Sequence, residues 1–254
     1  MTSESSLIIS IIIPVLNEAD HILPTLASIG EAKDVEAIVV DGGSVDGTVN
    51  LVEKFYPTSV KVISAATGRA SQMNAGAAVA KGAILLFLHA DTRLPVGFDT
   101  IVRDCLRKHH VVAGAFRLQI DGALVSESAH PSRCRAGERE GGTRLAGIRL
   151  VEMGVNWRSR LLGLPYGDQG IFMPATVFHD IGGFPNLPIM EDVASIRRLQ
   201  RLGTIAIAPA AVITSGRRWQ KLGILKTTWI NQLAIVAYFL GVSPDRIRCW
   251  YQSK

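Results

Sequence analysis

The chain has 254 residues, which is enough for one large domain or for one domain with an appendage. Its 48% hydrophobic and 19% charged residues can form a packed core and exclude a disordered chain. No apolar run reaches the length of about 18 residues that a membrane span needs, and no basic region precedes the first apolar run as in a signal peptide. The three cysteines are widely spaced and form no metal or disulfide pattern, so we expect a reducing, cytoplasmic location.

The net charge of +5 is unevenly distributed along the chain. Arg217 to Lys254 contains seven Lys or Arg residues against one Asp, so this segment alone carries +6. A basic segment can meet phosphates, acidic lipids or nucleic acid, although it is often only a solvated face. We expect no nucleic-acid partner, because no basic stripe alternates with aromatic residues in the core.

The first half alternates short apolar runs with helical patterns. The apolar runs are β-branched or leucine-rich and are bounded by Gly, Pro, Asp or Asn, as buried strands are. Strands are predicted at Leu7 to Pro14, Val35 to Asp41, Val60 to Ser64 and Ile84 to Leu88, and helices at Asp20 to Ile29, Gly47 to Phe55 and Arg69 to Ala80. This alternation predicts βαβ units and a mainly parallel sheet, in which ligands bind beyond the carboxyl ends of the strands.

The second half mixes strands and helices without a regular alternation. Strands are predicted at Val111 to Ile120, Gly170 to Met173 and Thr204 to Ala208, and helices at Ala175 to Ile181, Glu191 to Leu202 and Leu222 to Leu240. Residues 121–147 are rich in Gly, Ser and Arg and are predicted to be a loop insertion. We therefore expect an α/β domain over residues 1–215 and a basic, apolar helical appendage over residues 216–254.

The end of the second strand carries residues that suit a nucleotide. Asp41 is followed by a glycine turn that leads through Ser44 into a helix. The Asp41 carboxylate could accept hydrogen bonds from a uracil-type imide or a ribose hydroxyl, and Gly43 would let a ligand approach the backbone. A capped turn between a strand and a helix explains the same pattern equally well.

The strand at Ile84 to Leu88 delivers His89 and Asp91 to its carboxyl end. An aspartate there suits magnesium or manganese bridging two phosphates, because these ions prefer hard oxygen ligands. The metal would neutralise a departing diphosphate. One Asp and one His make a weak site unless the phosphates complete it, and a solvated loop is the alternative.

Three further groups carry weaker signals. The carboxylates of Glu191 and Asp192 could supply a general base for an acceptor hydroxyl, although acidic residues also favour helix N-termini. A polar turn between glycines, with Tyr166, Asp168 and Gln169, could line an acceptor pocket, although a tight turn explains it nearly as well.

Two arginines beside a tryptophan, Arg217, Arg218 and Trp219, could bind phosphate oxygens. The alternative is a basic surface patch.

The order of these motifs resembles the family-2 glycosyltransferases of the GT-A fold, from Ile9 to about Ala208. The resemblance is carried by Ile12-Ile13-Pro14-Val15-Leu16-Asn17-Glu18, Asp41-Gly42-Gly43-Ser44-Val45-Asp46-Gly47-Thr48, Asn74-Ala75-Gly76 with Ala80-Lys81-Gly82, His89-Ala90-Asp91 and Glu191-Asp192. Within this family, Arg69 to Asn74, Leu86 to Thr92 and Pro165 to Gly170 resemble a bacterial subgroup of unassigned substrate.

The resemblance implies a GT-A-like nucleotide-binding domain with a mixed, mainly parallel sheet, and an inverting transfer from a UDP- or GDP-type sugar donor to a hydroxyl acceptor. It implies that a divalent metal, manganese or magnesium, binds at Asp91 and that Asp192 or Glu191 is the base. The implied donor-binding residues are Pro14, Leu16, Asn17, Glu18, Asp41, Gly43, Ser44, Arg69, Asn74, His89, Ala90 and Asp91. The family's usual Asp-x-Asp is His89-Ala90-Asp91 here, a departure that affects the ribose contact and metal binding.

Two other functions fit parts of the pattern. A nucleotidyltransferase shares the sheet and the metal, but it would favour a Gly-rich signature with Arg and Lys at the positions of Asn17 and Glu18.

The second alternative function is a catalytically inactive binding protein at a membrane surface. The helix at Leu222 to Leu240 is apolar almost all round, so it must be buried in its own core, a partner subunit or a bilayer. Its basic and aromatic flanks favour an anionic membrane surface and a lipid-linked acceptor.

Overall fold

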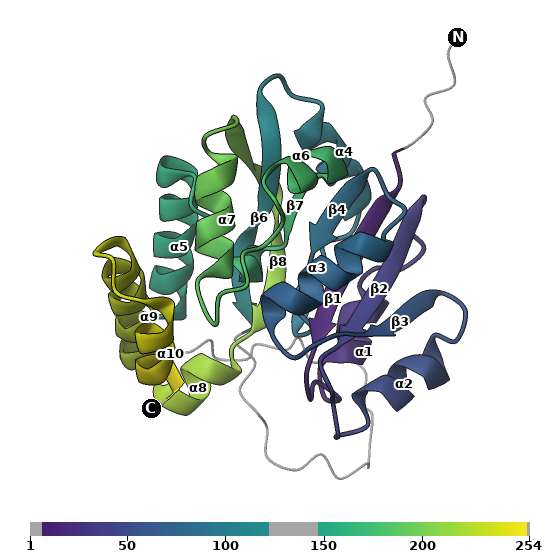
Figure 1. Cartoon of the computed structure of the whole chain (residues 1–254), viewed down its shortest axis with the longest axis horizontal. Coiled ribbons are helices and arrows are strands. Elements are labelled where there is room, and N and C mark those ends of the chain that lie inside the picture. Colours follow the sequence, from purple (N-terminus) through teal and green to yellow (C-terminus); the bar gives the residue numbers. More distant parts are fainter. Residues whose placement is uncertain (1–6, 122–146, 253–254) are drawn as a thin grey trace, which may run out of the picture.

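The structure, a computed structural model, describes residues 7–121 and 147–252. In this part of the chain a single eight-stranded sheet has the order β3-β2-β1-β4-β7-β6-β8-β5 (Figure 1). The strands are β1 Ile9–Val15, β2 Val35–Asp41, β3 Val60–Ser64, β4 Ile84–Phe87, β5 Thr92–Arg93, β6 Val111–Asp121, β7 Ile171–Pro174 and β8 Thr204–Ser215.

The sheet is mixed and mainly parallel, as the sequence predicts. β1 pairs in parallel with β2 and β4, β2 with β3, and β6 with β8. β7 runs antiparallel to β4 and β6, and β5 runs antiparallel to β8. In this register Val15 lies opposite Asp41 and Ile12 lies opposite Phe87, so the carboxyl ends of β1, β2 and β4 meet at one edge.

Helices cover both faces of the sheet (Figure 1). One buried cluster joins the sheet to residues of α1, α2, α4 and α5, and a second joins it to α3, α6 and α7. The helices are α1 Ile22–Ala27, α2 Thr48–Phe55, α3 Arg69–Val79, α4 Phe98–Leu106, α5 Ile148–Leu162, α6 Ala175–Asp180 and α7 Glu191–Leu199.

The alternation of side chains along β1 explains why helices can pack on both faces of the sheet. Ile11 and Ile13 belong to the first cluster, whereas Ile12 belongs to the second. All three side chains are fully buried. A strand that is buried on both faces requires a continuous apolar run, and this is what its sequence provides.

The C-terminal helices are α8 Arg217–Leu222, α9 Ile224–Phe239 and α10 Pro244–Gln252. The α9–α10 pair lies at the edge of the molecule, beyond α5 and α7 (Figure 1). Ala234 and Ala237 of α9 and Ile247 of α10 pack against Met190 and Val193 at the start of α7. Among the helices of residues 7–121 and 147–252, none combines the length and apolar character that a membrane crossing requires.

Several boundaries differ from the sequence predictions. β8 extends to Ser215 rather than ending near Ala208, because it pairs with β6 along most of its length and with β5 at its end. α4, α5, α8 and α10 were not predicted as separate helices. Of the predicted insertion, Asp121 ends β6 and Gly147 precedes α5, and the residues between them lie outside the described part of the chain.

Alanine substitutions at two helical glycines test the packing of α3 on the sheet. A Cβ on Gly76 would lie 2.5 Å from Cγ2 of Ile12, whereas a Cβ on Gly154 in α5 would meet no atom within 4 Å. Gly76→Ala should therefore lower the free energy of unfolding by about 1–3 kcal/mol through overpacking. Gly154→Ala should raise it by about 0.5–1 kcal/mol through helix propensity. Urea denaturation of both variants measures the difference, and similar effects on stability would contradict the packing described here.

Candidate functional site

The turns that follow β1 and β2 are hydrogen-bonded to each other. The side chain of Asn17 accepts the N–H of Val45, and the hydroxyl of Ser44 accepts the N–H of Asn17, each at 2.9 Å. One residue further on, the hydroxyl of Thr48 accepts the N–H of Glu18, also at 2.9 Å. These contacts hold the two strand ends as one unit, so the polar residues there have fixed positions.

Asp41 is the last residue of β2 and is buried. Its carboxylate accepts the N–H groups of Gly43 and Ser44, each at 3.0 Å. Gly43 has a φ of 100°, a backbone conformation that L side chains rarely adopt. These bonds close the turn after β2, but the predicted helix cap near Ser44 is not formed, because α2 begins at Thr48 after Gly47, without a side-chain cap. A carboxylate has about four acceptor sites, so Asp41 can still accept a hydrogen bond from a ligand.

Arg217 joins this edge from the far end of the chain. The pairing of β5 with β8 places Ser215 beside Asp91, whose carbonyl accepts the Ser215 N–H at 3.1 Å. Two residues on, the Arg217 guanidinium forms two hydrogen bonds with Glu18, at 2.6 and 2.9 Å, and lies 3.2 Å from Asp91. Burial raises the pKa of Asp91, and the charge of Arg217 partly offsets this effect.

The donor set for a divalent metal is small. In the described ranges, no group of three or more His, Cys, Asp or Glu residues is arranged to hold a metal ion. Glu18 and Asp91 nevertheless share one cation, the Arg217 guanidinium, so two hard oxygen donors lie around the same positive charge. Such a pair fits magnesium or manganese only if oxygen atoms of a bound diphosphate complete the coordination shell.

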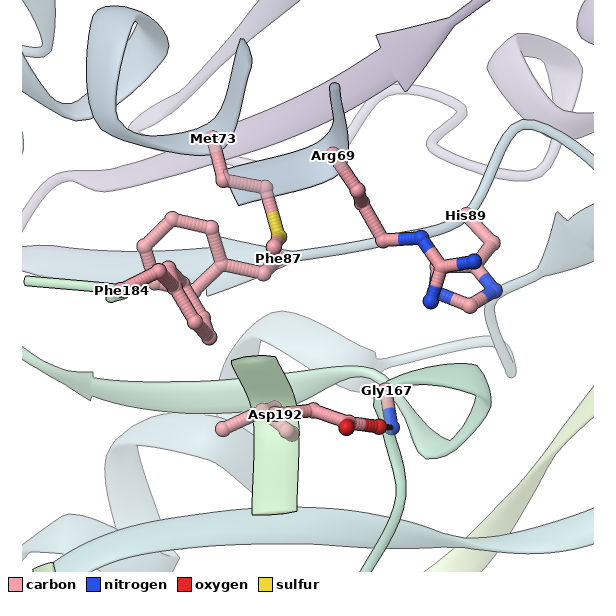
Figure 2. Close-up of a pocket in the computed structure, with 8 residues that line it drawn as sticks. Arg69, Met73, Phe87, His89, Gly167, Phe184 and Asp192 are labelled. Atoms are coloured by element: carbon pink, nitrogen blue, oxygen red, sulfur yellow. Dashed lines mark hydrogen bonds between the residues drawn. The ribbon is translucent and has the colours of Figure 1, made fainter. Parts of the chain in front are cut away.

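A small cavity lies between α3, the loop after β4, and the start of α7 (Figure 2). Its volume of about 10 Å³ gives room for roughly one water molecule. One end is polar and the other apolar. The polar lining residues are Arg69, His89, Gly167 and Asp192, and the apolar ones are Met73, Phe87, Ile171 and Phe184.

The two predicted carboxylates at the start of α7 have different surroundings. Asp192 lines the cavity, and its Oδ2 accepts the N–H of Gly167 at 2.8 Å. Glu191 is buried and forms an ion pair with Arg69 at 3.2 Å. Burial raises the pKa of Glu191, and Arg69 opposes this rise. Asp192 is therefore the carboxylate of this pair that faces the cavity.

His89 lines the same cavity. Its Nε2 is buried and has no hydrogen-bond partner among the described residues. Burial lowers the pKa of His89 to about 3, and the positive charges of Arg69 and Arg217 contribute to the shift. The imidazole is therefore neutral near pH 7.

Two of the predicted site residues form structural contacts. The Asn74 amide donates to the carbonyl of Phe184 at 2.8 Å and accepts its N–H at 3.0 Å, which ties α3 to the loop before α7. The Gln169 amide donates to the carbonyl of Phe116 and accepts hydrogen bonds from the Ser159 hydroxyl and the Tyr166 N–H. The sequence motifs did not connect Asn74 with Phe184, or Gln169 with Phe116 and Ser159.

The remaining predicted residues lie around the site. Pro14 lies half-buried one residue before the end of β1, and Leu16 is exposed just beyond that end. Ala90 is buried between His89 and Asp91. The Arg158 guanidinium lies 3.4 Å from the centre of the Tyr166 ring. Trp219 packs against the core cluster of the sheet, and the side chain of Arg218 lies outside the described part of the chain.

Comparison with known proteins identifies the family. The sequence profile of glycosyl transferase family 2 matches residues 10–150, more than half of the chain. The chain therefore belongs to this family. No curated protein matches it significantly.

Solved glycosyltransferase structures share the fold. TarS from S. aureus in complex with UDP has a TM-score of 0.58 and 18% identity over 82% of this chain and 60% of that chain. TarS in complex with UDP-GlcNAc has a TM-score of 0.59 and 19% identity over 82% and 58%. The mannosyltransferase PcManGT from Pyrobaculum calidifontis in complex with GDP-Man and Mn²⁺ has a TM-score of 0.57 and 19% identity over 84% and 57%. The chain thus spans about three fifths of the chains in these structures, of which the two TarS chains are residues 1–349, and it spans 43% of the longer TarS chain.

The free energy of unfolding should depend on pH because of Asp168, which lies in the 3₁₀ turn η1 Gly167–Gln169. Its Oδ1 is buried without a partner in the described ranges, and burial raises its pKa from 3.8 to about 6. A folded-state pKa above the unfolded one means that Asp168 favours folding below pH 3.8, and that this contribution is lost as the pH rises through 6. Asp168→Asn should therefore raise the urea midpoint more at pH 7.5 than at pH 4.

The matched control for this comparison is Asp20→Asn, which removes one exposed carboxylate. Both variants are compared with the parent at the two pH values. An Asp168→Asn effect that is the same at pH 7.5 and pH 4 would contradict a raised pKa.

Proposed function

We propose that the chain transfers a sugar from a nucleoside diphosphate donor of the UDP or GDP type to a hydroxyl acceptor, with inversion at the anomeric carbon. The observation that carries the proposal is the position of Asp192, whose carboxylate lines the cavity while Glu191 is paired with Arg69. The family assignment and the sugar nucleotides in the similar structures support the donor class. The family assignment also favours glycosyl transfer over nucleotidyl transfer.

We place the donor at the edge where β1, β2 and β4 end. Asp41 offers a buried acceptor for the base or the ribose, and the exposed side chain of Leu16 offers an apolar contact for the base. Arg217 is the cation that meets the diphosphate at this edge, because its guanidinium already lies among Glu18 and Asp91. Guanidinium groups bind phosphate oxygens with two parallel hydrogen bonds.

Asp91 would hold a divalent metal, with the diphosphate and Glu18 as neighbouring oxygen donors. The manganese ion in the PcManGT complex supports this assignment by analogy with that protein. The metal, when bound, neutralises charge on the departing diphosphate. Arg217 lies 3.2 Å from Asp91, so its own charge contributes to the same neutralisation.

Inversion requires a single displacement with the base and the leaving group on opposite faces of the sugar. The acceptor hydroxyl gives its proton to Asp192 while its oxygen bonds to the anomeric carbon. The bond from that carbon to the phosphate oxygen breaks, and its electron pair leaves with the nucleoside diphosphate. The Gly167 N–H, which bonds to Asp192 Oδ2, keeps the carboxylate in place.

Asp192→Asn should lower turnover by roughly 10²-fold or more while leaving donor affinity nearly unchanged, because a base acts on the acceptor rather than on the nucleotide. Glu191→Gln is the matched comparison at the neighbouring position. Transfer or hydrolysis of UDP- and GDP-sugars is measured together with calorimetric binding of the nucleotide. If Glu191→Gln is the deleterious change, the roles of the two carboxylates are reversed. If neither variant affects turnover, the inverting mechanism is wrong.

We also propose that the protein attaches peripherally to an anionic membrane surface, at the inner face of the cytoplasmic membrane, and uses a lipid-linked acceptor. One side of α9 is exposed and apolar at helical spacing, rather than buried all round. Its residues are Leu225, Trp229 and Val236, which are 87%, 72% and 52% exposed, and Leu240, just after the end of the helix, is 78% exposed. The exposed Lys226 lies on the same helix, and basic residues near anionic lipids contribute about 1 kcal/mol each.

Replacing Leu225 and Trp229 together by serine should weaken binding to anionic vesicles by roughly tenfold or more, because apolar side chains are lost from the membrane contact. Val96→Ser is the control, since Val96 is fully exposed away from α9. Flotation with vesicles of phosphatidylglycerol or of phosphatidylcholine measures binding. A parent protein that floats with neither lipid would contradict the membrane proposal.

A further inference from the structure

We propose that the cavity between His89, Gly167 and Asp192 receives the nucleophilic hydroxyl of the acceptor, with His89 as a positioning residue beside the base. This inference rests on the proposed function and specifies its acceptor site. It assigns His89 to the acceptor rather than to the ribose of the donor, the contact that the family resemblance implies for this position.

Two polar atoms from separate elements converge on Gly167. A Cβ built on Gly167 would lie 3.1 Å from Nε2 of His89 and 3.3 Å from Oδ2 of Asp192. His89 comes from the loop after β4 and Asp192 from the first turn of α7, on opposite sides of the cavity (Figure 2). The space exists because residue 167 has no side chain, so one small group there can contact both polar atoms.

The size of the cavity matches a hydroxyl group. About 10 Å³ admits roughly one oxygen atom with its hydrogen. A buried imidazole nitrogen without a partner is unusual in proteins and calls for a polar group beside it. A hydroxyl can donate its hydrogen to Asp192 Oδ2 and accept one from His89 in the tautomer that is protonated on Nε2.

The chemistry of the hydroxyl is then determined by its two partners. Its hydrogen points at the carboxylate that removes it, and the His89 bond uses one oxygen lone pair, which leaves the other for the anomeric carbon. Met73, Phe87, Ile171 and Phe184 line the apolar end of the cavity and give water molecules no hydrogen-bond partner there, whereas the Arg69 guanidinium at the polar end is paired with Glu191. Within this space the bonds to Asp192 and His89 hold the hydroxyl in one orientation, which favours displacement.

Gly167→Ala tests the proposal directly, because its methyl group would share the space of the hydroxyl. The φ of Gly167 is not in the left-handed region, so alanine fits the backbone. Water serves as the acceptor, and the probe is the release of UDP or GDP from a panel of nucleotide sugars with manganese. Hydrolysis should fall by roughly tenfold or more, while the Kd for the nucleotide changes by less than about twofold. Gly154→Ala, where an added Cβ meets no atom within 4 Å, should change neither value.

His89 variants give an independent measurement. Glutamine can place an amide nitrogen near the position of Nε2, whereas leucine has a similar size and no polar atom. His89→Gln should therefore keep more hydrolysis than His89→Leu, with equal nucleotide binding in both. Hydrolysis by Gly167→Ala at the parental rate would overturn the proposal. So would a His89→Leu variant that loses nucleotide binding and turnover together. A parent protein that binds no nucleotide contradicts the proposed function itself.

Discussion

The parallel pairing of β1 with β2 on one side and with β4 on the other is the constraint on which the site depends. It brings the carboxyl ends of three strands to one edge, where Asp41 and the turn residues meet. The Gln72 amide donates to the carbonyls of Val15 and Val40, each at 2.8 Å, at the carboxyl ends of β1 and β2. Because β1 is buried on both faces, a slip of one residue would exchange its two sets of side chains, and packing therefore opposes it.

The C-terminal part of the chain is coupled to this edge by charge. Arg217 balances Glu18 and Asp91, so these two carboxylates and one guanidinium lie together at the edge before any nucleotide binds. A diphosphate that approaches Arg217 competes with these carboxylates for its hydrogen bonds. We infer that a second cation at Asp91 offsets the repulsion between the diphosphate and the carboxylate, which is a physical reason for metal-dependent donor binding.

Local sequence signals predicted the strands of the first half, because an apolar run between turn residues is sufficient to identify a buried strand. They did not predict contacts between distant segments. Asn74 bonds to Phe184, 110 residues away, and the extension of β8 depends on its pairing with β5 and β6. Glu191 and Asp192 are equivalent in the sequence, and only the tertiary contacts with Arg69 and Gly167 separate their roles. The pairing of Arg217 with Glu18 had no local signal.

The proposed transfer depends on a nucleoside diphosphate that binds at the strand ends with the help of Asp91. Calorimetric titration of UDP and of GDP, with and without manganese, in the parent and in Asp91→Asn tests this binding. We expect at least one nucleotide to bind the parent more tightly with manganese, and Asp91→Asn to remove this metal dependence while the fold is retained. A variant whose affinity and metal dependence equal those of the parent, or a parent that binds neither nucleotide, would show that Asp91 does not support donor binding at this edge.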